Sequence, residues 1–354
     1  MDLGPVREKI DGIDREIIAK LNERFRLASE VARVKHKAGL PIYHPGREEA
    51  LLRKLAEINP GPLSESGMRA IYREIISAMI SLEAPMTIAY LGPEATYTEQ
   101  AARKNFGTQP NYAPMPTIPD VFAAVEKGEA DHGVIPIENS TGGVVSHSID
   151  MLAETDLTII NQVYLSIEHC LISQSPLEEV REVRSKDQAL AQCREWLARH
   201  LPHAQQVDAD STAQAVKQAG ELKGVAAIAS ELAAEKYEVP ILAKGIQDRA
   251  NNVTRFLVLG REPVGSGTGH DRTSLLLSLN DEPGALEKAL KPFSSRGINM
   301  TKIESRPSRR KAWDYLFYID IDGHWSDEIV QAAVGELKAC CPLVKWLGSY
   351  PVRG

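Results

Sequence analysis

The 354-residue sequence lacks an excess of basic residues, a long apolar run and a metal-binding cysteine pattern. Its formal net charge is -7 at pH 7, whereas nucleic-acid-binding proteins usually carry an excess of Lys and Arg, so we expect no nucleic-acid partner. No apolar run approaches the roughly 18 residues of a membrane span, and no apolar core of a secretion signal follows the first residues. We therefore expect no membrane partner and a cytoplasmic location.

Motifs for metals and nucleotides are also missing. Cys170, Cys193, Cys340 and Cys341 form no Cys-x-x-Cys pair and no zinc spacing with histidine, so we expect reduced thiols and no metal. The Gly-rich stretch 265–269 has its last glycine misplaced for a nucleotide loop and opens no helix, which indicates a linker. With no Rossmann or Walker loop elsewhere, we expect no cofactor and disfavour a fused dehydrogenase.

The chain divides into three predicted domains, at residues 1–85, 86–262 and 272–354. The first is predicted to be all-α. Apolar residues recur at helical spacing for about 35 residues up to Gly39, and two shorter helices follow over about 46–58 and 64–83. Three helices with one so long cannot easily close a core alone, so we expect helix exchange in a homodimer or a dimer of dimers.

The second and third segments contain strands. Short apolar strands at 87–91, 134–137 and 256–259 alternate with helices, which predicts an α/β domain with a mainly parallel sheet and two lobes around a cleft. Polar loops at the ends of these strands are the expected ligand sites. From Ser274 to Tyr350 the order strand–helix–strand–strand–helix–strand predicts an α+β ferredoxin-like domain, so the fold class is multidomain.

Basic residues share one face of the first helix. Arg24 and Lys35 are eleven residues apart and only about 20° out of phase. Arg7 falls roughly 100° from Arg24 and addresses a different site. Arg47 and Glu48 begin the second helix. Each is an ordinary surface charge when taken alone, but together they fit a cage for a dicarboxylate.

This segment resembles the all-helical class of chorismate mutase. The matching pieces are Val6-Arg7-Glu8-Lys9-Ile10, Leu21-Asn22-Glu23-Arg24, Val34-Lys35 and Arg47-Glu48. The resemblance implies that Arg24, Lys35 and Arg47 hold the carboxylates and ether oxygen of chorismate. It also implies that Arg7 comes from the other subunit and that Glu48 accepts the substrate hydroxyl. The reaction is a unimolecular rearrangement, which needs positioning and charge stabilisation but no cofactor.

Two positions depart from the mutase pattern. His44 stands where the family often has an Asp near the substrate hydroxyl, and Glu83 stands where a Gln often donates to the ether oxygen. A glutamate donates only when it is protonated. We therefore expect mutase activity to fall as the pH rises and Glu83 loses its proton.

The triplet Thr254-Arg255-Phe256 is the most informative signal of the second segment, because a polar loop enters an apolar strand there. A hydroxyl beside a guanidinium at this place suits a weak acid next to an anion holder. With four further motifs in order, the triplet resembles prephenate dehydratase, a family with a two-lobed, periplasmic-binding-like domain. Those motifs are Gly92-Pro93-Glu94-Ala95-Thr96-Tyr97-Thr98, Pro136-Ile137-Glu138-Asn139-Ser140, His169-Cys170-Leu171 and Asp210-Ser211-Thr212.

The dehydratase resemblance implies roles for these residues. Thr254 would be the general acid at the leaving hydroxyl of prephenate, Arg255 would hold a carboxylate or order the loop, and Phe256 would pack beneath. The polar residues implied around the substrate are Thr96, Thr98, Glu138, Asn139, Ser140, Ser211, Thr212 and Asn252. Ser211 and Thr212 equally suit a helix N-cap, and His169 suits a buried structural role better than that of a base.

One loop position departs from the dehydratase pattern in a way that can strain the backbone. Ala95 stands where the family usually has Gly. If the backbone φ is positive there, the alanine costs about 1 kcal/mol or shifts the loop. We expect the loop to adapt without loss of activity.

The third segment resembles the ACT regulatory domain of phenylalanine-sensing dehydratases, through Gly284-Ala285-Leu286 and Glu304-Ser305-Arg306-Pro307. The resemblance implies that L-phenylalanine binds between two such domains of a dimer. The residues implied to meet it are Asn280, Gly284, Ala285, Leu286, Glu304, Ser305 and Arg306.

The sequence therefore predicts a bifunctional enzyme that converts chorismate to prephenate and prephenate to phenylpyruvate, with L-phenylalanine as inhibitor. Two alternatives remain. A non-catalytic amino-acid sensor would also combine a two-lobed domain with an ACT domain, but it needs neither Thr254 nor the cationic helix. Alternatively, the helical segment is only a dimerisation element of a monofunctional dehydratase.

Overall fold

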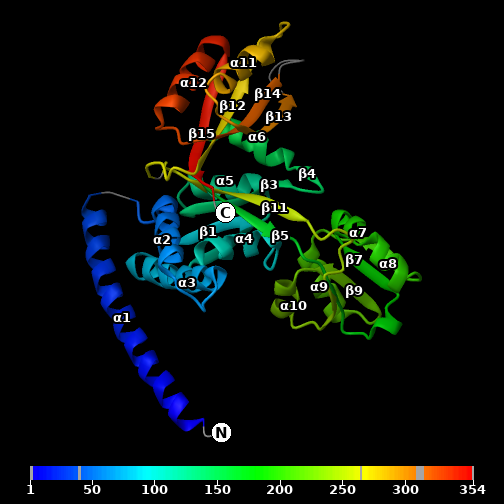
Figure 1. Cartoon of the computed structure of the whole chain (residues 1–354). Coiled ribbons are helices and arrows are strands. Elements are labelled where there is room, and N and C mark those ends of the chain that lie inside the picture. The colour runs from blue at the N-terminus through cyan, green and yellow to red at the C-terminus, as the bar shows by residue number, and fades with distance from the viewer. Residues whose placement is uncertain (1–2, 39–40, 264, 308–314, 353–354) are drawn as a thin grey trace.

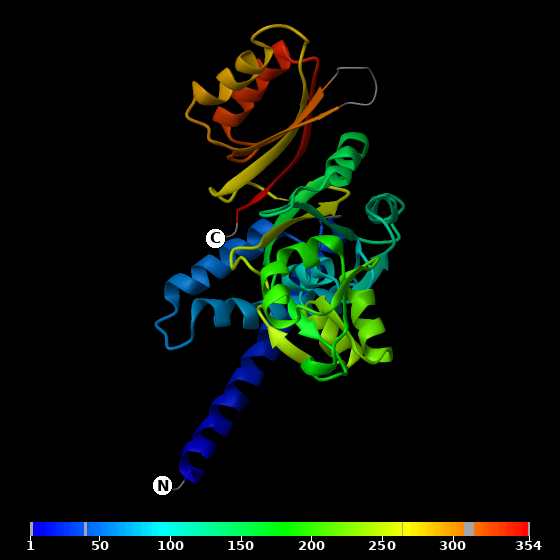
Figure 2. The same ribbon diagram turned by 90° about the vertical axis from the view of Figure 1, so that its right-hand side faces the viewer.

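The structure is a computed structural model that describes residues 3–38, 41–263, 265–307 and 315–352, without the side chains of His36 and Glu83. Its three parts follow one another along the chain. In Figures 1 and 2 the C-terminal domain lies at the top, the α/β domain in the middle, and the first helix extends downward. Within the described ranges, no helix has both the length and the apolar character needed to cross a membrane.

The N-terminal part consists of α1 (Gly4–Lys37), α2 (Pro45–Ile58) and α3 (Glu65–Glu83). These bounds agree with the predicted helices. Pro45 occupies the first turn of α2, where its missing N–H is not needed, and the Ser64 hydroxyl caps α3 by accepting from the Gly67 N–H at 3.1 Å. The N-terminal half of α1 projects away from the rest of the chain (Figure 1), so its apolar residues are exposed.

The first lobe of the α/β domain is built on one six-stranded sheet with the order β2-β1-β3-β11-β5 and β4 paired to β3. Its strands are β1 (Thr87–Leu91), β2 (Asn111–Met115), β3 (His132–Asn139), β4 (Gly143–Val144), β5 (Thr158–Ser166) and β11 (Val253–Gly260). Its helices are α4 (Tyr97–Phe106), α5 (Ile118–Glu126) and α6 (Ser146–Glu154).

The second lobe is inserted between β5 and β11 and has a five-stranded sheet with the order β10-β6-β9-β7-β8. Its strands are β6 (Cys170–Ile172), β7 (Glu182–Ser185), β8 (Gln205–Asp208), β9 (Val225–Ala229) and β10 (Ile241–Lys244). Its helices are α7 (Asp187–Gln192), α8 (Arg194–His200), α9 (Thr212–Glu221) and α10 (Glu231–Tyr237), with a 3-10 turn at Leu177–Glu179.

The expectation of a mainly parallel sheet is wrong, because both sheets are mixed. In the first lobe β1 runs parallel to β2 and β3, but β11 runs antiparallel to both β3 and β5. The insertion explains the difference. The chain leaves the first lobe through β5 and returns through β11, so these neighbouring strands carry it in opposite directions.

The C-terminal domain has the predicted order: β12 (Asp271–Ser278), α11 (Ala285–Ser294), β13 (Met300–Pro307), β14 (Tyr315–Asp322), α12 (Glu328–Cys340) and β15 (Leu343–Pro351). Its four strands form an antiparallel sheet with the order β13-β14-β12-β15. Alternation along β12 buries Leu275 and Leu277 against α11 and α12, while Leu276 joins Leu257 and Leu259 of the first lobe in a shared core. The domain is thus packed on the α/β domain through one face of its sheet.

Candidate active sites

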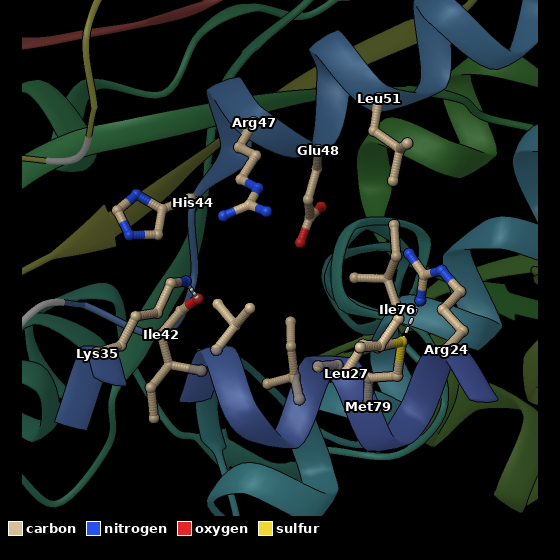
Figure 3. Close-up of a pocket in the computed structure, with 13 residues that line it drawn as sticks. Arg24, Leu27, Lys35, Ile42, His44, Arg47, Glu48, Leu51, Ile76 and Met79 are labelled. Carbon is tan, nitrogen blue, oxygen red and sulfur yellow. Dashed lines mark hydrogen bonds between the residues drawn. The ribbon is translucent and has the colours of Figure 1, made fainter. Parts of the chain in front are cut away.

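A cavity of about 300 Å³ lies between α1, α2 and α3. Figure 3 shows Arg24 and Lys35 reaching it from one stretch of α1, and Arg47 and Glu48 from the first turn of α2. Aliphatic residues that include Leu27, Val31, Leu51, Ile76 and Ile80 form the rest of its wall. The structure therefore brings Arg24 and Lys35, which helical phase had placed on one side of α1, together with Arg47 and Glu48 of α2.

The charges of this pocket are held in place by backbone and sulfur contacts. The Lys35 Nζ donates to the Ile42 carbonyl at 3.1 Å, and the Arg24 guanidinium contacts the Met79 sulfur. Burial, followed by the positive charges of Lys35 and Arg47, lowers the pKa of His44. His44 is therefore a neutral polar group among cations at pH 7, and the pocket has a net positive field suited to an anion.

Arg73 of α3 was missed by the sequence analysis. Its guanidinium lies 3.4 Å from the Glu48 carboxylate and donates to the Asn105 carbonyl of α4 at 2.7 Å. It orients Glu48 and ties the helical pocket to the α/β domain. Helical phase could have identified Arg73. It lies four residues after Arg69 and therefore on the same face of α3, and Arg69 pairs with Glu49 of α2.

Two expected residues of this site are not part of the pocket as described. Arg7 lies on α1, seventeen residues before Arg24 and therefore roughly 25 Å away along the helix axis. Glu83 is the last residue of α3, but its side chain lies outside the described residues.

A second polar site lies between the two lobes, where β3 ends and the antiparallel β11 begins. The Asn139 Nδ2 donates to the Thr254 Oγ1 at 2.7 Å and to the Asn252 Oδ1 at 2.7 Å. Thr254 is only 9% exposed. Because Asn139 occupies one acceptor position of the hydroxyl oxygen, Thr254 keeps its hydrogen for an acceptor in the cleft.

Gln192 of α7 extends this polar chain across to the second lobe. Its side-chain oxygen accepts from Asn252 at 3.0 Å, and its nitrogen donates to the Thr141 Oγ1 at 2.7 Å. The same oxygen lies 2.8 Å from the Nε2 of His169, whose Nδ1 lies 2.8 Å from the Tyr97 hydroxyl. Burial lowers the pKa of His169, and the Gln192 contact only partly offsets this. His169 is thus a neutral bridge between polar groups.

Several other expected substrate residues have structural contacts. Thr96 caps α4 and Ser211 caps α9, each by accepting a backbone N–H of the first turn. The Ser140 hydroxyl donates to the Asn251 carbonyl and accepts from the Val253 N–H, which joins the end of β3 to the start of β11. Thr98 is buried on α4, and Thr212 begins α9.

Ala95 has a φ of 63° and is 2% exposed, so it adopts the left-handed conformation that glycine favours. Its N–H donates to the Glu99 Oε2 at 2.6 Å. Burial raises the pKa of Glu99, but donors from Ala95, Arg103 and Tyr90 outweigh it and the net pKa is lowered. The ionised Glu99, which the sequence analysis missed, therefore anchors this loop.

Arg255 and Glu138 do not lie in the cleft with Thr254. Successive strand residues point to opposite faces, and these two side chains face the C-terminal domain. The Arg255 guanidinium contacts Glu138 at 3.1 Å and Asp320 at 2.5 Å, and Lys302 pairs with the other Glu138 oxygen. The expectation that Arg255 and Glu138 lie beside the substrate in the cleft is therefore wrong. Phe256 returns to the Thr254 side and packs in the core beneath the cleft.

The expected effector residues occupy two places in the C-terminal domain. Gly284, with a φ of 83°, precedes α11, while Ala285 and Leu286 form its first turn. Asn280 lies in the loop between β12 and α11. Glu304, Ser305 and Arg306 lie on the edge strand β13. Arg306 differs from its expected position, because its guanidinium lies 3.3 Å from Asp150 of α6 in the first lobe.

Comparison with known families gives one match for each part of the chain. The models match chorismate mutase type II over residues 6–84, prephenate dehydratase over 88–264 and the ACT domain over 273–338. The bifunctional chorismate mutase/prephenate dehydratase of Aquifex aeolicus is 46% identical over 355 residues, covering 99% of this chain and 98% of that protein.

Solved structures resemble the α/β and C-terminal domains together. The prephenate dehydratase of Arthrobacter aurescens in complex with L-Phe superposes with a TM-score of 0.71 and 34% identity, over 75% of this chain and 90% of that chain. A protein described as a novel type of quorum quenching acylase superposes with a TM-score of 0.70 and 30% identity, over 75% and 98% of the two chains.

Two separate polar sites on a chain with these three family matches define a multidomain enzyme with a C-terminal ACT domain. The full-length similarity is more specific than this class. The chain belongs to the bifunctional chorismate mutase/prephenate dehydratase family.

Proposed function

We propose that the chain rearranges chorismate to prephenate in the helical pocket, converts prephenate to phenylpyruvate between the two lobes, and is inhibited by L-phenylalanine. The observation that carries the proposal is the convergence of Arg24, Lys35 and Arg47 on one cavity of about 300 Å³ in a chain of this family. A sensor, or a segment used only for dimerisation, has no use for such a pocket.

The first reaction requires the enzyme to bind a dianion in a folded conformation and to stabilise charge on its ether oxygen. In our proposal Arg24 and Arg47 hold the carboxylates from α1 and α2, and Lys35 donates to the ether oxygen. Glu48, which Arg73 orients, accepts the substrate hydroxyl. His44 borders the same site, and Glu83 is assigned to the ether oxygen. No group is transferred to the protein, so positioning and electrostatics supply the whole rate enhancement.

Completion of this pocket by a second chain is part of the proposal. Arg7 lies too far along α1 to enter the pocket of its own chain. The part of α1 that carries it exposes Val6, Ile10, Ile13 and Ile17, each by about half of its surface. Association of two chains along this stripe would bury it and place Arg7 beside the partner's pocket, in a homodimer or a dimer of dimers.

The second reaction breaks the ring C–O bond of prephenate while a carboxylate leaves as carbon dioxide, and its electron pair makes the ring aromatic. Departing hydroxide needs a proton donor, which we assign to Thr254 because Asn139 leaves its hydrogen available. Asn139, Ser140 and Asn252 set the geometry around that hydroxyl. Thr96, Thr98, Ser211 and Thr212 are proposed to line the remainder of the substrate site from α4 and α9.

Regulation is assigned to the ACT domain. A relative of similar structure was solved with L-Phe. For this chain we propose that L-phenylalanine is bound at the start of α11 and along β13, by Asn280, Gly284, Ala285, Leu286, Glu304 and Ser305. Arg306 already has Asp150 as a partner and is assigned a role at the interface between the domains.

The mutase activity is proposed to occupy residues 1–85, the dehydratase activity residues 86–262, and the regulation by L-phenylalanine residues 272–354. We also propose a cytoplasmic location, which the four free cysteines support.

The decisive experiment is product analysis of the purified full chain incubated with chorismate and no added cofactor. We expect chorismate to disappear, prephenate to appear transiently and phenylpyruvate to accumulate. Unchanged chorismate removes the mutase assignment. Prephenate that persists without conversion removes the dehydratase assignment.

A further inference from the structure

The catalytic hydroxyl and a buried ion network are attached to the same two strands, on opposite faces. In register, Thr254 of β11 pairs with Asn139 of β3, and the adjacent Arg255 pairs with Glu138. Thr254 and Asn139 meet on the cleft side, and Arg255 and Glu138 meet on the side of the ACT domain. A displacement of the charged pair that reaches the backbone therefore also moves the hydroxyl and its amide partner.

The ACT domain supplies the other partners of Arg255 from two of its strands. Asp320 of β14 accepts from the Arg255 Nη1 at 2.5 Å, and the Tyr350 hydroxyl of β15 accepts from the Arg255 Nη2 at 2.8 Å. Ser274 of β12 donates to the second Asp320 oxygen at 2.5 Å and lies 2.5 Å from the Tyr350 hydroxyl. Three adjacent strands of the ACT sheet, β14, β12 and β15, thus hold one side chain of the dehydratase domain.

Burial makes this arrangement sensitive to small movements. The side chains of Arg255 and Asp320 are 2% and 0% exposed. Burial alone would lower the pKa of Arg255, but Tyr350 and Asp320 outweigh it and the pKa lies well above its ordinary value. An ion pair at this depth has no water to replace a lost partner, so a shift of the ACT sheet must carry Arg255 along or separate it from Asp320 and leave Glu138 as its only charged partner among the described residues.

We propose that Arg255, Glu138 and Asp320 are positioning residues through which the ACT domain sets the alignment of Thr254 with Asn139, and that effector binding alters dehydration along this route. The inference rests on the proposed role of Thr254. Lys302 of β13 completes the network by pairing with Glu138, and β13 also carries the proposed effector residues Glu304 and Ser305. Glu138 thereby links β13 to Asn139, since it pairs with Lys302 and directly precedes Asn139 on β3.

The test compares two conservative variants of the full chain. Asp320→Asn removes the charge opposite Arg255 but keeps the size and one acceptor. Asp150→Asn is the matched control, because it breaks the Arg306 pair across the same domain interface, at 22% exposure and away from Thr254. Each is assayed for dehydratase kcat and KM with prephenate, for mutase activity and for the concentration of L-phenylalanine that halves dehydration.

For Asp320→Asn we expect kcat of dehydration to fall by roughly 10- to 100-fold, since a displacement of about 1 Å at a reacting group costs that much. KM should stay within about 2-fold because none of the three residues touches substrate, and mutase activity should be unchanged. Residual dehydration should lose most of its response to L-phenylalanine. Asp150→Asn should keep both kcat and that response.

Three results would overturn the inference: full kcat with a normal phenylalanine response in Asp320→Asn, equal loss in Asp150→Asn, or parallel loss of mutase and dehydratase activity. If Asp320→Asn does not fold, Glu138→Gln gives the same test, because the Glu138 side chain is 30% exposed and tolerates an amide. An inactive wild-type dehydratase would instead refute the proposed function itself.

Discussion

At the residue scale, Thr254 and Arg255 show what strand geometry adds to a sequence motif. The triplet identified the place correctly, but it implied that hydroxyl and guanidinium face the same ligand. Consecutive strand residues point to opposite faces, so only one of them reaches the cleft. Arg255 forms a contact between domains, because Asp320 of the ACT domain lies opposite it. Asp320 is 65 residues further along the chain, so no local sequence pattern reveals that partner.

His132 provides a prediction on stability against pH. It begins β3 between Tyr43 and Phe106, and burial lowers its pKa from 6.5 to about 4. The unfolded chain therefore binds a proton at pH values where the folded chain does not. Stability is fully present above pH 6.5 and falls as the pH drops toward 4, by about 2–3 kcal/mol.

The measurement is urea denaturation at several pH values between 7 and 4, with wild type and His132→Gln. The variant should lose a large part of the slope in this range. His203→Gln is the control, because His203 is exposed and its removal should leave the slope unchanged. An identical slope in wild type and His132→Gln would contradict the assignment.

At the element scale, the helices were more predictable than the strands. Apolar periodicity placed the three N-terminal helices to within a residue or two, because each has a start or stop signal such as Pro45 or Ser64. The strands β2, β4, β5, β7, β8 and β10 were not predicted. All but β5 have two to five residues, too few to show a clear apolar alternation. In β5 the polar Asn161 and Gln162 interrupt the apolar residues. The strand direction of β11 depended on the inserted lobe and was not readable locally.

The exposed stripe of α1 carries a prediction on assembly. Replacing Ile13 and Ile17 by Glu should weaken association by at least roughly 100-fold, because each buried isoleucine contributes about 1.5–3 kcal/mol. Mutase activity should fall with it, since Arg7 is then not delivered to the partner's pocket. Sedimentation equilibrium and mutase assays test this.

Ala19→Glu is the matched control for the stripe, because Ala19 lies about 200° round the helix from Ile17. It should leave both association and mutase activity near the wild-type level. Unchanged association in the Ile13→Glu, Ile17→Glu variant would exclude this face as the interface.

The strand β15 carries a prediction on the packing of the ACT domain. A Cβ at Gly348 would lie 2.1 Å from the Ile159 carbonyl oxygen of β5, so Gly348→Ala must push the two domains apart. We expect a loss of about 3 kcal/mol in the stability of this interface, measured by thermal unfolding. Gly335→Ala on α12, where a Cβ meets nothing within 4 Å, should instead stabilise by about 0.5–1 kcal/mol. Equal effects of the two substitutions would contradict the close approach.

At the scale of the whole molecule, the two candidate sites lie on separate domains joined by specific contacts. Arg73 connects the mutase pocket to α4, and Arg255 connects the dehydratase cleft to the ACT domain. Motif order predicted the three domains and both chemistries, because short motifs mark the segments that form each site, even where two of them lie 115 residues apart, as Asn139 and Thr254 do. The contacts between domains depend on residues far apart in sequence, and only the structure provides them.

The central claim is that one chain has two independent active sites, and mixing two inactivated variants tests it most directly. Lys35→Met should abolish the mutase alone, and Thr254→Ala should abolish the dehydratase alone. Neither variant by itself should form phenylpyruvate from chorismate, while their mixture should form it through released prephenate. Phenylpyruvate from the Thr254→Ala variant alone, or none from the mixture, would contradict the account.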